Sequence, residues 1–159
     1  MTAHSPNRGG APVGFLTELP PIEASAVMCF RLWQSRANDR HAISHEFGQI
    51  FGPEYGDVAF QALDAICDLC MRHGRRPLLR HQVTCKCLGA DEACFANFVA
   101  AASEGAREDA MLIATLIVRP DFAPSLVGLA EDFGFALRRV ASGRNTQPSA
   151  FTRHETTLH

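Results

Sequence analysis

The amino-acid sequence predicts an all-α fold, a compact single-domain bundle of about six helices. Apolar residues recur at helical spacing through most of residues 21–140. Capping residues and Gly or Pro breakers separate these amphipathic segments. The chain has 159 residues, of which 47% are hydrophobic and 20% charged, so it holds enough apolar material for one core.

The helices that we expect are short and follow one another closely. They cover residues 22–37, 39–52, 55–73, 91–105, 106–118 and 121–140. Asp39 and Asp91 are typical N-cap residues for the second and fourth helices. Gly52-Pro53 ends the second helix, and Gly74 follows the third. The sequence therefore predicts the helix boundaries from local signals alone.

The apolar stripes indicate which side of each helix is buried. The stripe of the first helix comprises Ile22, Ala26, Cys29, Phe30 and Trp33. The stripe of the last helix comprises Phe122, Leu126, Leu129, Ala130, Phe133, Leu137 and Val140. Residues 106–118 carry apolar side chains on nearly every face, so we expect them to form the central helix. A buried strand over Met111–Val118 is the alternative, because periodicity does not separate the two.

Three segments lack helical periodicity. Residues 1–20 and 141–159 are rich in Pro, Gly, Ser or Thr, and we expect flexible arms that flank a domain over residues 21–140. Residues 75–88 form an irregular connector that contains Pro77. A short extended piece is expected there at Gln82–Cys85.

Composition and charge exclude several classes of protein. The net charge of −2 argues against a nucleic-acid-binding protein. The longest apolar run, residues 110–118, is too short to span a bilayer, so no membrane partner is expected. Residues 1–21 lack the apolar region of a secretory signal. We therefore expect a cytoplasmic protein with reduced thiols.

A local basic stretch stands out from an acidic chain. Residues 71–90 hold five cations and no acid, and the other ten cations face all seventeen acids, so the rest of the chain carries −7. The five cations are Arg72, Arg75, Arg76, Arg80 and Lys86. Arginine forks match phosphate and carboxylate oxygens, so the stretch predicts an anion site or an acidic partner surface. A solvated loop is the alternative.

Cysteines and histidines are concentrated in residues 67–94. Seven potential metal ligands lie within these 28 residues: Cys67, Cys70, His73, His81, Cys85, Cys87 and Cys94. Zinc needs four such groups, and an iron–sulfur cluster needs cysteine thiolates, so the number is sufficient for either. Zinc is the expected metal, with an iron–sulfur cluster as the alternative.

The positions of these cysteines favour different roles. Cys67 and Cys70 lie on an apolar helical stripe, so they are core residues, metal ligands or a redox pair. Cys85 and Cys87 lie beside cations in the connector, and we expect them to be the more reactive thiols. In an extended stretch they would share one face. Cys94 is expected near the third position of its helix, where the helix dipole lowers a thiol pKa.

Three functional hypotheses follow. The first is a small helical protein that binds a metal or senses redox state through residues 67–94 and acts on a protein partner. The second is a helical interaction or adaptor module whose cysteines only fill the core. The third, an enzyme that uses a Cys or His of the connector, has the least support because spacing places no nucleophile, base and orienting group together. An oligomer is compatible with each hypothesis.

Overall fold

Five α-helices and one small sheet make up residues 8–145, which the computed structural model describes. The helices are α1 (Pro21–Ser35), α2 (Arg40–His73), α3 (Ala90–Ser103), α4 (Arg107–Ile117) and α5 (Ala123–Asn145). The strands β1 (Pro12–Phe15) and β2 (Cys87–Gly89) pair in antiparallel fashion. Three 3₁₀ turns, η1 (Arg8–Gly10), η2 (Leu16–Glu18) and η3 (Pro120–Phe122), complete the order. The predicted all-α class is confirmed.

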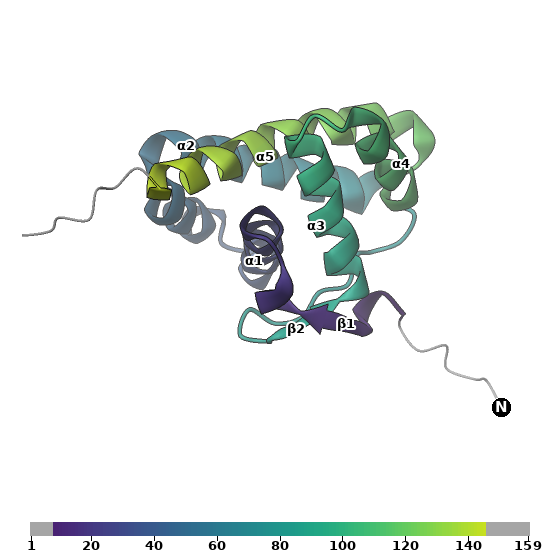
Figure 1. Ribbon diagram of the computed structural model, residues 1–159, viewed down its shortest axis with the longest axis horizontal. Coiled ribbons are helices and arrows are strands. Elements are labelled where there is room, and N and C mark those ends of the chain that lie inside the picture. Colours follow the sequence, from purple (N-terminus) through teal and green to yellow (C-terminus); the bar gives the residue numbers. More distant parts are fainter. Residues whose placement is uncertain (1–7, 146–159) are drawn as a thin grey trace, which may run out of the picture.

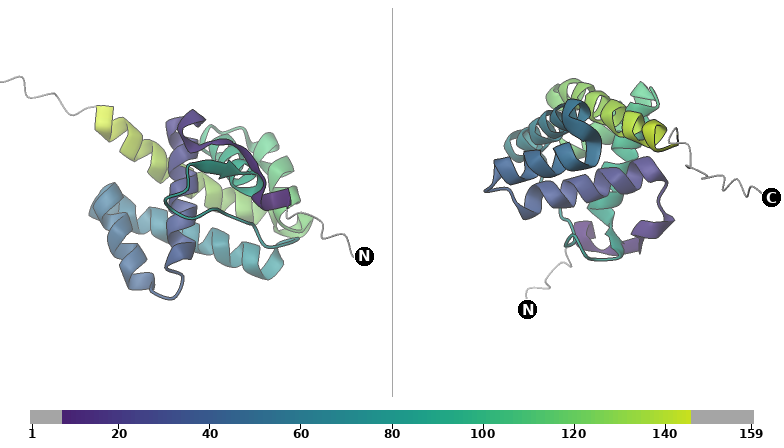
Figure 2. Two further views of the ribbon diagram at one scale, coloured as in Figure 1. Left: turned by 90° about the horizontal axis from the view of Figure 1, so that it is seen from below. Right: turned by 90° about the vertical axis from the view of Figure 1, so that its left-hand side faces the viewer.

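The helices form two crossed groups. In Figure 1, α2 and α5 run side by side across the top, while α1 and α3 lie below them and the β1–β2 sheet lies at the bottom edge. The views in Figure 2 show the sheet on the side of α1 and α3 away from α5. The helical bundle and the sheet thus enclose the start of α3.

The helix α2 bends sharply at Gly52, where the sequence predicted the end of one helix and the start of another. Gly52 has a φ of 83°, a left-handed conformation that favours glycine. Pro53 follows and cannot donate a backbone hydrogen bond. The predicted boundary is therefore confirmed as a kink inside one continuous element, which begins where the Asp39 side chain accepts a bond from the Ala42 amide.

The central helix is α3 rather than residues 106–118. Phe95, Phe98 and Val99 of α3 are all buried. The close approach of α3 and α5 depends on Gly134, since a Cβ there would lie 2.5 Å from the Ser103 Cβ. By contrast, α4 packs at the edge of the bundle. The placement we predicted for residues 106–118 is wrong, and their strand alternative is wrong because they are helical.

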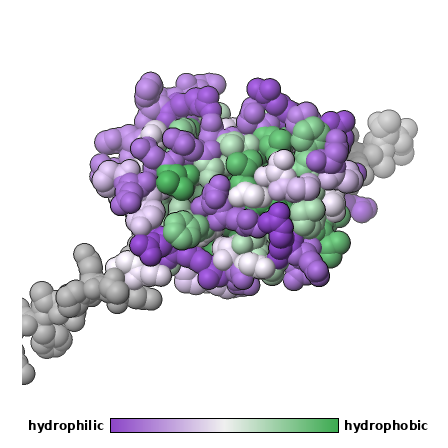
Figure 3. All heavy atoms as spheres, turned by 90° about the horizontal axis from the view of Figure 1, so that it is seen from above, coloured by the Kyte–Doolittle hydropathy of each residue, from purple (hydrophilic) through white to green (hydrophobic). Residues whose placement is uncertain are grey.

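The side chains of α4 show why its position differs from the prediction. Ala110, Ala114 and Ile117 are buried on one side of the helix. Leu112 and Leu116 are 68% and 70% exposed on the other side. The face seen in Figure 3, which looks down on the top of Figure 1, likewise carries apolar residues between polar ones. An all-round apolar helix therefore need not be central.

The N-terminal segment is part of the domain from Arg8 onward. We predicted residues 1–20 as an arm outside the core, but Gly9 is buried and β1 pairs with β2 through Phe15 and Cys87. Leu16 and Leu19 pack on a small cluster with Val27 and Leu88. The predicted tail is also shorter than expected at its start, because α5 continues to Asn145. Residues 1–7 and 146–159 lie outside the described part.

Candidate functional site

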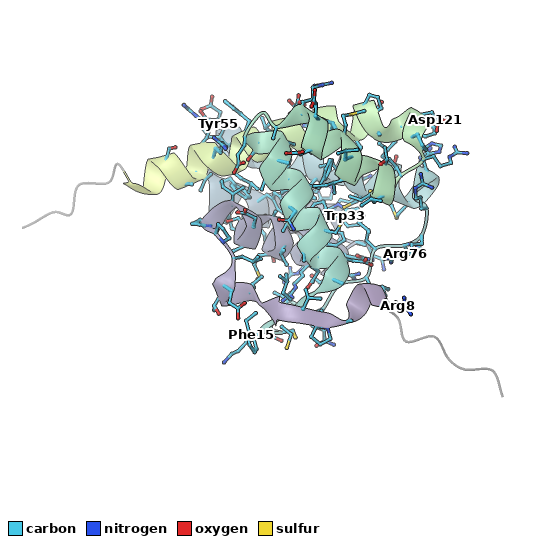
Figure 4. All side chains as sticks on the ribbon, turned by 45° about the vertical axis from the view of Figure 1, so that its right-hand side comes forward. Arg8, Phe15, Trp33, Tyr55, Arg76 and Asp121 are labelled. Carbon is cyan, nitrogen blue, oxygen red and sulfur yellow. The ribbon has the colours of Figure 1, made fainter. Side chains whose placement is uncertain are left out.

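The connector between α2 and α3 is ordered by two adjacent carboxylates at the start of α3. Asp91 accepts two hydrogen bonds from the Arg76 guanidinium, at 2.6 and 2.7 Å, and a third from the Leu79 amide at 2.7 Å. Figure 4 shows Arg76 beside the lower half of α3. Asp91 is not the N-cap that we predicted, because the N-cap residue is Gly89. The Asp91 carboxylate instead holds the first half of the connector against the helix.

Glu92 forms a fully buried ion pair with Arg31 of α1. The side chains have 0% exposure, and the guanidinium donates to the two carboxylate oxygens at 2.6 and 2.8 Å. The carboxylate also accepts from the amides of Gly89 and His81, each at 2.9 Å. Its bond to Gly89 is one half of a capping box, in which the third helical residue reaches back to the N-cap. Glu92 thereby joins α1, α3 and the connector.

The turn that bears Cys85 wraps around the Arg31 guanidinium. Arg31 donates to the carbonyls of Cys85 at 2.6 Å, Cys87 at 2.7 Å and Gln82 at 3.2 Å. The Cys85 amide donates to the Gln82 carbonyl at 2.9 Å, which closes the turn. The extended piece predicted at Gln82–Cys85 is therefore wrong. The strand begins at Cys87, so Cys85 and Cys87 do not form the extended pair that we expected.

Hydrogen bonds within the site shift the pKa values of Glu92, Asp91 and Arg31. Burial alone would raise the pKa of Glu92, but hydrogen bonds from Arg31, Gly89 and His81 bring it below its usual value. Asp91 behaves in the same way: the bonds from Arg76 and Leu79 outweigh burial and lower its pKa. The hydrogen bond to Glu92, together with the Glu92 charge, outweighs burial and raises the pKa of Arg31. The charged forms of Arg31 and Glu92 are therefore both favoured.

His81 and Cys85 meet at the surface of this network. The Cys85 Sγ lies 3.6 Å from Nδ1 of His81, and Nε2 of the same ring lies 3.0 Å from the Gly10 carbonyl oxygen. A carbonyl only accepts, so this geometry assigns the proton to Nε2 and leaves Nδ1 to accept from the thiol. Gly89 permits the arrangement, since a Cβ there would lie 2.9 Å from the imidazole. The result is a thiol, a base and an orienting carbonyl.

The other predicted ligands lie apart from this pair. Cys67 is buried in the core, and burial raises its pKa well above the usual value. Burial raises the pKa of Cys70 to about 12. His73 stacks on Phe122 at 3.7 Å between centroids. Both cysteines of the helical pair thus have the surroundings expected for core residues.

Cys94 differs from the prediction in position and in ionisation. It is the fifth residue of α3, two positions further from the N-terminus of the helix than expected and beyond the first turn, where the dipole acts most strongly. Burial raises its pKa, and the charge of Asp91 raises it further. The lowered thiol pKa that we expected there is therefore wrong.

No metal centre is formed by the part of the chain that the structure describes. Among residues 8–145, no three His, Cys, Asp or Glu side chains converge so as to hold an ion. All six cysteines are unpaired thiols. The seven predicted ligands do not meet, and the zinc and iron–sulfur predictions gain no support from this geometry.

The five cations of the predicted anion site differ in whether their side chains have a partner. Arg72 pairs with Asp68 of its own helix at 3.1 Å, and Arg76 pairs with Asp91. Arg75 donates to the Thr115 carbonyl at 2.6 Å. The side chains of Arg80 and Lys86 make no hydrogen bond or ion pair within residues 8–145. The predicted anion site is thus reduced from five residues to two.

Arg31, Asp91, Glu92 and Gly10 were missed as site residues. One signal was available for Arg31, which follows Cys29 and Phe30 inside an apolar stretch of α1. A cation in such a place needs a buried partner. Glu92 is 61 positions away, so the sequence alone did not identify it.

A core role for Cys67 makes a testable prediction. Cys67→Ala should lower the free energy of unfolding by about 1–2 kcal/mol, because a small buried group and its contacts are lost. Urea denaturation measures this change. The half-exposed Cys87 provides the control, and Cys87→Ala should change stability by less than about 0.5 kcal/mol. Native Cys67 that reacts with a thiol reagent as fast as Cys85 would contradict the core assignment.

The function proposed below rests on the geometry of the site rather than on similarity to known proteins. None of the helices in residues 8–145 is long and apolar enough to cross a membrane. No family model, curated protein or solved structure matches this chain.

Proposed function

We propose that this chain is a small redox-responsive helical protein whose reactive group is Cys85, and that it transmits its oxidation state to a protein partner. The observation that carries the proposal is the alignment of Cys85 Sγ, the His81 ring and the Gly10 carbonyl, with separations of 3.6 and 3.0 Å. A reducing compartment such as the cytoplasm is part of the proposal, since all six thiols are unpaired.

The proposed chemistry is oxidation of Cys85 by a hydroperoxide. Nδ1 of His81 takes the thiol proton, and the sulfur attacks one oxygen of the peroxide. An S–O bond forms while the O–O bond breaks, and the leaving oxygen takes the proton from His81 and departs as water or an alcohol. Cys85 then carries a sulfenic acid, which condenses with a second thiol to give a disulfide and water.

The contacts of His81 support transmission to a partner. Cys85 in a disulfide has no proton to donate to Nδ1, so the imidazole loses one of its two hydrogen bonds, while Nε2 still donates to the Gly10 carbonyl. Gly10 leads directly into β1, whose Val13 and Phe15 are 57% and 54% exposed. Phe15 points away from the helices at the lower edge of Figure 4. We therefore propose that the partner contacts β1.

The test compares the oxidation rate of Cys85 in three variants. Each protein is treated with hydrogen peroxide, sulfenic acid is trapped with a dione reagent, and mass spectrometry assigns the labelled cysteine. His81→Asn keeps a polar atom beside the thiol but removes the base, so oxidation of Cys85 should slow at least about tenfold. Cys85→Ser should abolish rapid labelling, and Cys87→Ser should leave it unchanged.

The design separates chemistry from folding. Glu92 binds the backbone amide of His81, so the side-chain change in His81→Asn leaves that anchor intact. Unchanged melting of the variant would show this. The proposal fails if Cys85 in the unaltered protein oxidises no faster than Cys87, or if His81→Asn leaves the rate of Cys85 oxidation unchanged.

An interaction module without chemistry is the second candidate. It is favoured by the exposed Leu112 and Leu116, which lie one turn apart on the outer side of α4. This candidate gains if peroxide leaves the partner binding of the unaltered protein unchanged while Leu112→Ser abolishes the binding. The redox proposal predicts that peroxide alters the binding of the unaltered protein, that Cys85→Ser removes this effect, and that Leu112→Ser leaves binding intact.

A further inference from the structure

A cavity of about 450 Å³ lies beside the thiol site, between the end of α1 and the connector turn. Its wall includes Ser35 of α1 together with Arg80, His81 and Thr84 of the connector. His81 therefore faces this cavity and also contacts the Cys85 sulfur. The turn from Gln82 to Cys85 carries the chain from the cavity wall to the thiol within four residues.

Arg80 is the charged group of this cavity. It is half-buried, yet it makes no hydrogen bond or ion pair in the part of the chain that the structure describes. Burial lowers its pKa, and the charge of the Glu92 carboxylate opposes that effect only in part. A desolvated guanidinium without an anion is unfavourable, whereas a bound carboxylate would satisfy it.

The neighbouring charged residues that the structure describes do not pair with Arg80, so its guanidinium can contact a ligand. Arg31 lines the same cavity, but its five donor positions are directed to Glu92 and three carbonyls. Lys86 is exposed and lies beyond the turn, outside the cavity lining. The cavity thus presents one uncompensated positive charge next to a thiol and its base.

We propose that this cavity binds the carboxylate of a small anionic disulfide, and that Cys85 exchanges with its S–S bond. The inference rests on the proposed function and names its substrate class. Arg80 forms the carboxylate contact, and the size of the cavity suits a ligand of a few residues. Such a ligand oxidises Cys85 without a free hydroperoxide.

The exchange step conserves atoms and electrons. His81 Nδ1 accepts the Cys85 proton, and the thiolate attacks the nearer sulfur of the disulfide. The new S–S bond joins Cys85 to half of the ligand, while the old S–S bond breaks. The departing thiolate receives the proton from His81 and leaves as a thiol. Cys85 is oxidised to a mixed disulfide, and the other half of the ligand is reduced.

The experiment compares an anionic with a neutral disulfide. Glutathione disulfide and bis(2-hydroxyethyl) disulfide are each incubated with the protein, and mass spectrometry follows the mixed disulfide at Cys85. In Arg80→Gln the rate with glutathione disulfide should fall about tenfold or more, the loss expected for one charge-assisted contact. The rate with the neutral disulfide should stay the same. Arg72→Gln, which removes an exposed cation of the same stretch, should change neither rate.

A second variant keeps the proposal testable if Arg80→Gln does not fold. Thr84 is exposed at the cavity rim, so Thr84→Glu adds a repulsive charge without disturbing the core. It should slow only the anionic disulfide. The inference is overturned if Arg80→Gln or Thr84→Glu slows both disulfides equally or neither. If Cys85 of the unaltered protein reacts with neither disulfide nor peroxide, the proposed function fails as well.

Discussion

Arg31→Met should lower the free energy of unfolding by about 3–5 kcal/mol, the cost of leaving a buried charge without its partner. The Glu92 carboxylate would remain at 0% exposure with only two amide donors. The carbonyls of Cys85 and Cys87 would lose their 2.6 and 2.7 Å bonds at the same time. Urea unfolding followed by circular dichroism measures the loss.

An exposed ion pair supplies the control for this change. Arg36 and Glu46 are 2.8 Å apart, with side-chain exposures of 52% and 28%. Arg36→Met should therefore cost less than about 1 kcal/mol. In the double variant Arg31→Met with Glu92→Met, part of the lost stability should return, because no buried charge remains. A cost for Arg31→Met no larger than that for Arg36→Met would contradict the role of the buried pair.

The two carboxylates at the start of α3, Asp91 and Glu92, make the stability of the protein sensitive to acid. The pKa of Glu92 and that of Asp91 are lowered by folding, so the unfolded chain binds protons more readily than the folded one. Their stabilising contribution is complete above the unfolded-state pKa, about 4 for these groups, and is lost as the pH falls through the lower folded-state value. Melting temperature measured against pH should fall less steeply in acid for Arg31→Met than for the unaltered protein.

Gly56→Ala should cost about 2–3 kcal/mol through a clash at the bend of α2. Gly56 is buried where the two halves of α2 fold toward each other. An added Cβ would lie 2.8 Å from the Gly48 Cα and 2.9 Å from the Phe47 carbonyl oxygen. These neighbours are backbone atoms, so they cannot turn aside as a side chain would. Thermal and urea unfolding measure the effect.

Gly48 offers a matched control on the opposite side of the same contact. A Cβ at Gly48 meets nothing within 4 Å outside its own helical turn. Gly48→Ala should therefore stabilise the protein by about 0.5–1 kcal/mol, the usual gain for alanine inside a helix. The account of the bend fails if the two substitutions change stability in the same direction and by similar amounts.

Local signals determined most of the secondary structure. The Asp39 cap, the break at Gly52 and the stripes of α1 and α5 act within one or two turns, so they can be read from neighbouring residues. The connector was likewise recognised as irregular, and Cys85 was identified there as a reactive candidate with His81 nearby in the sequence. These inferences needed no knowledge of how the helices pack.

Long-range contacts decided the rest of the site. Arg31 and Glu92 are separated by 61 positions and His81 and Gly10 by 71, and no periodicity relates such residues. The edge position of α4 was likewise decided by packing between helices, and Gly134 allows α3 to approach α5 closely. The N-terminal segment joined the domain through its pairing with β2 and through apolar contacts of Leu16 and Leu19 with Val27 and Leu88. The sequence by itself therefore determined the helices and the candidate thiol. Tertiary packing decided which base, which buried charge pair and which cavity surround that thiol, because ion pairing and steric fit act between segments that are distant along the chain.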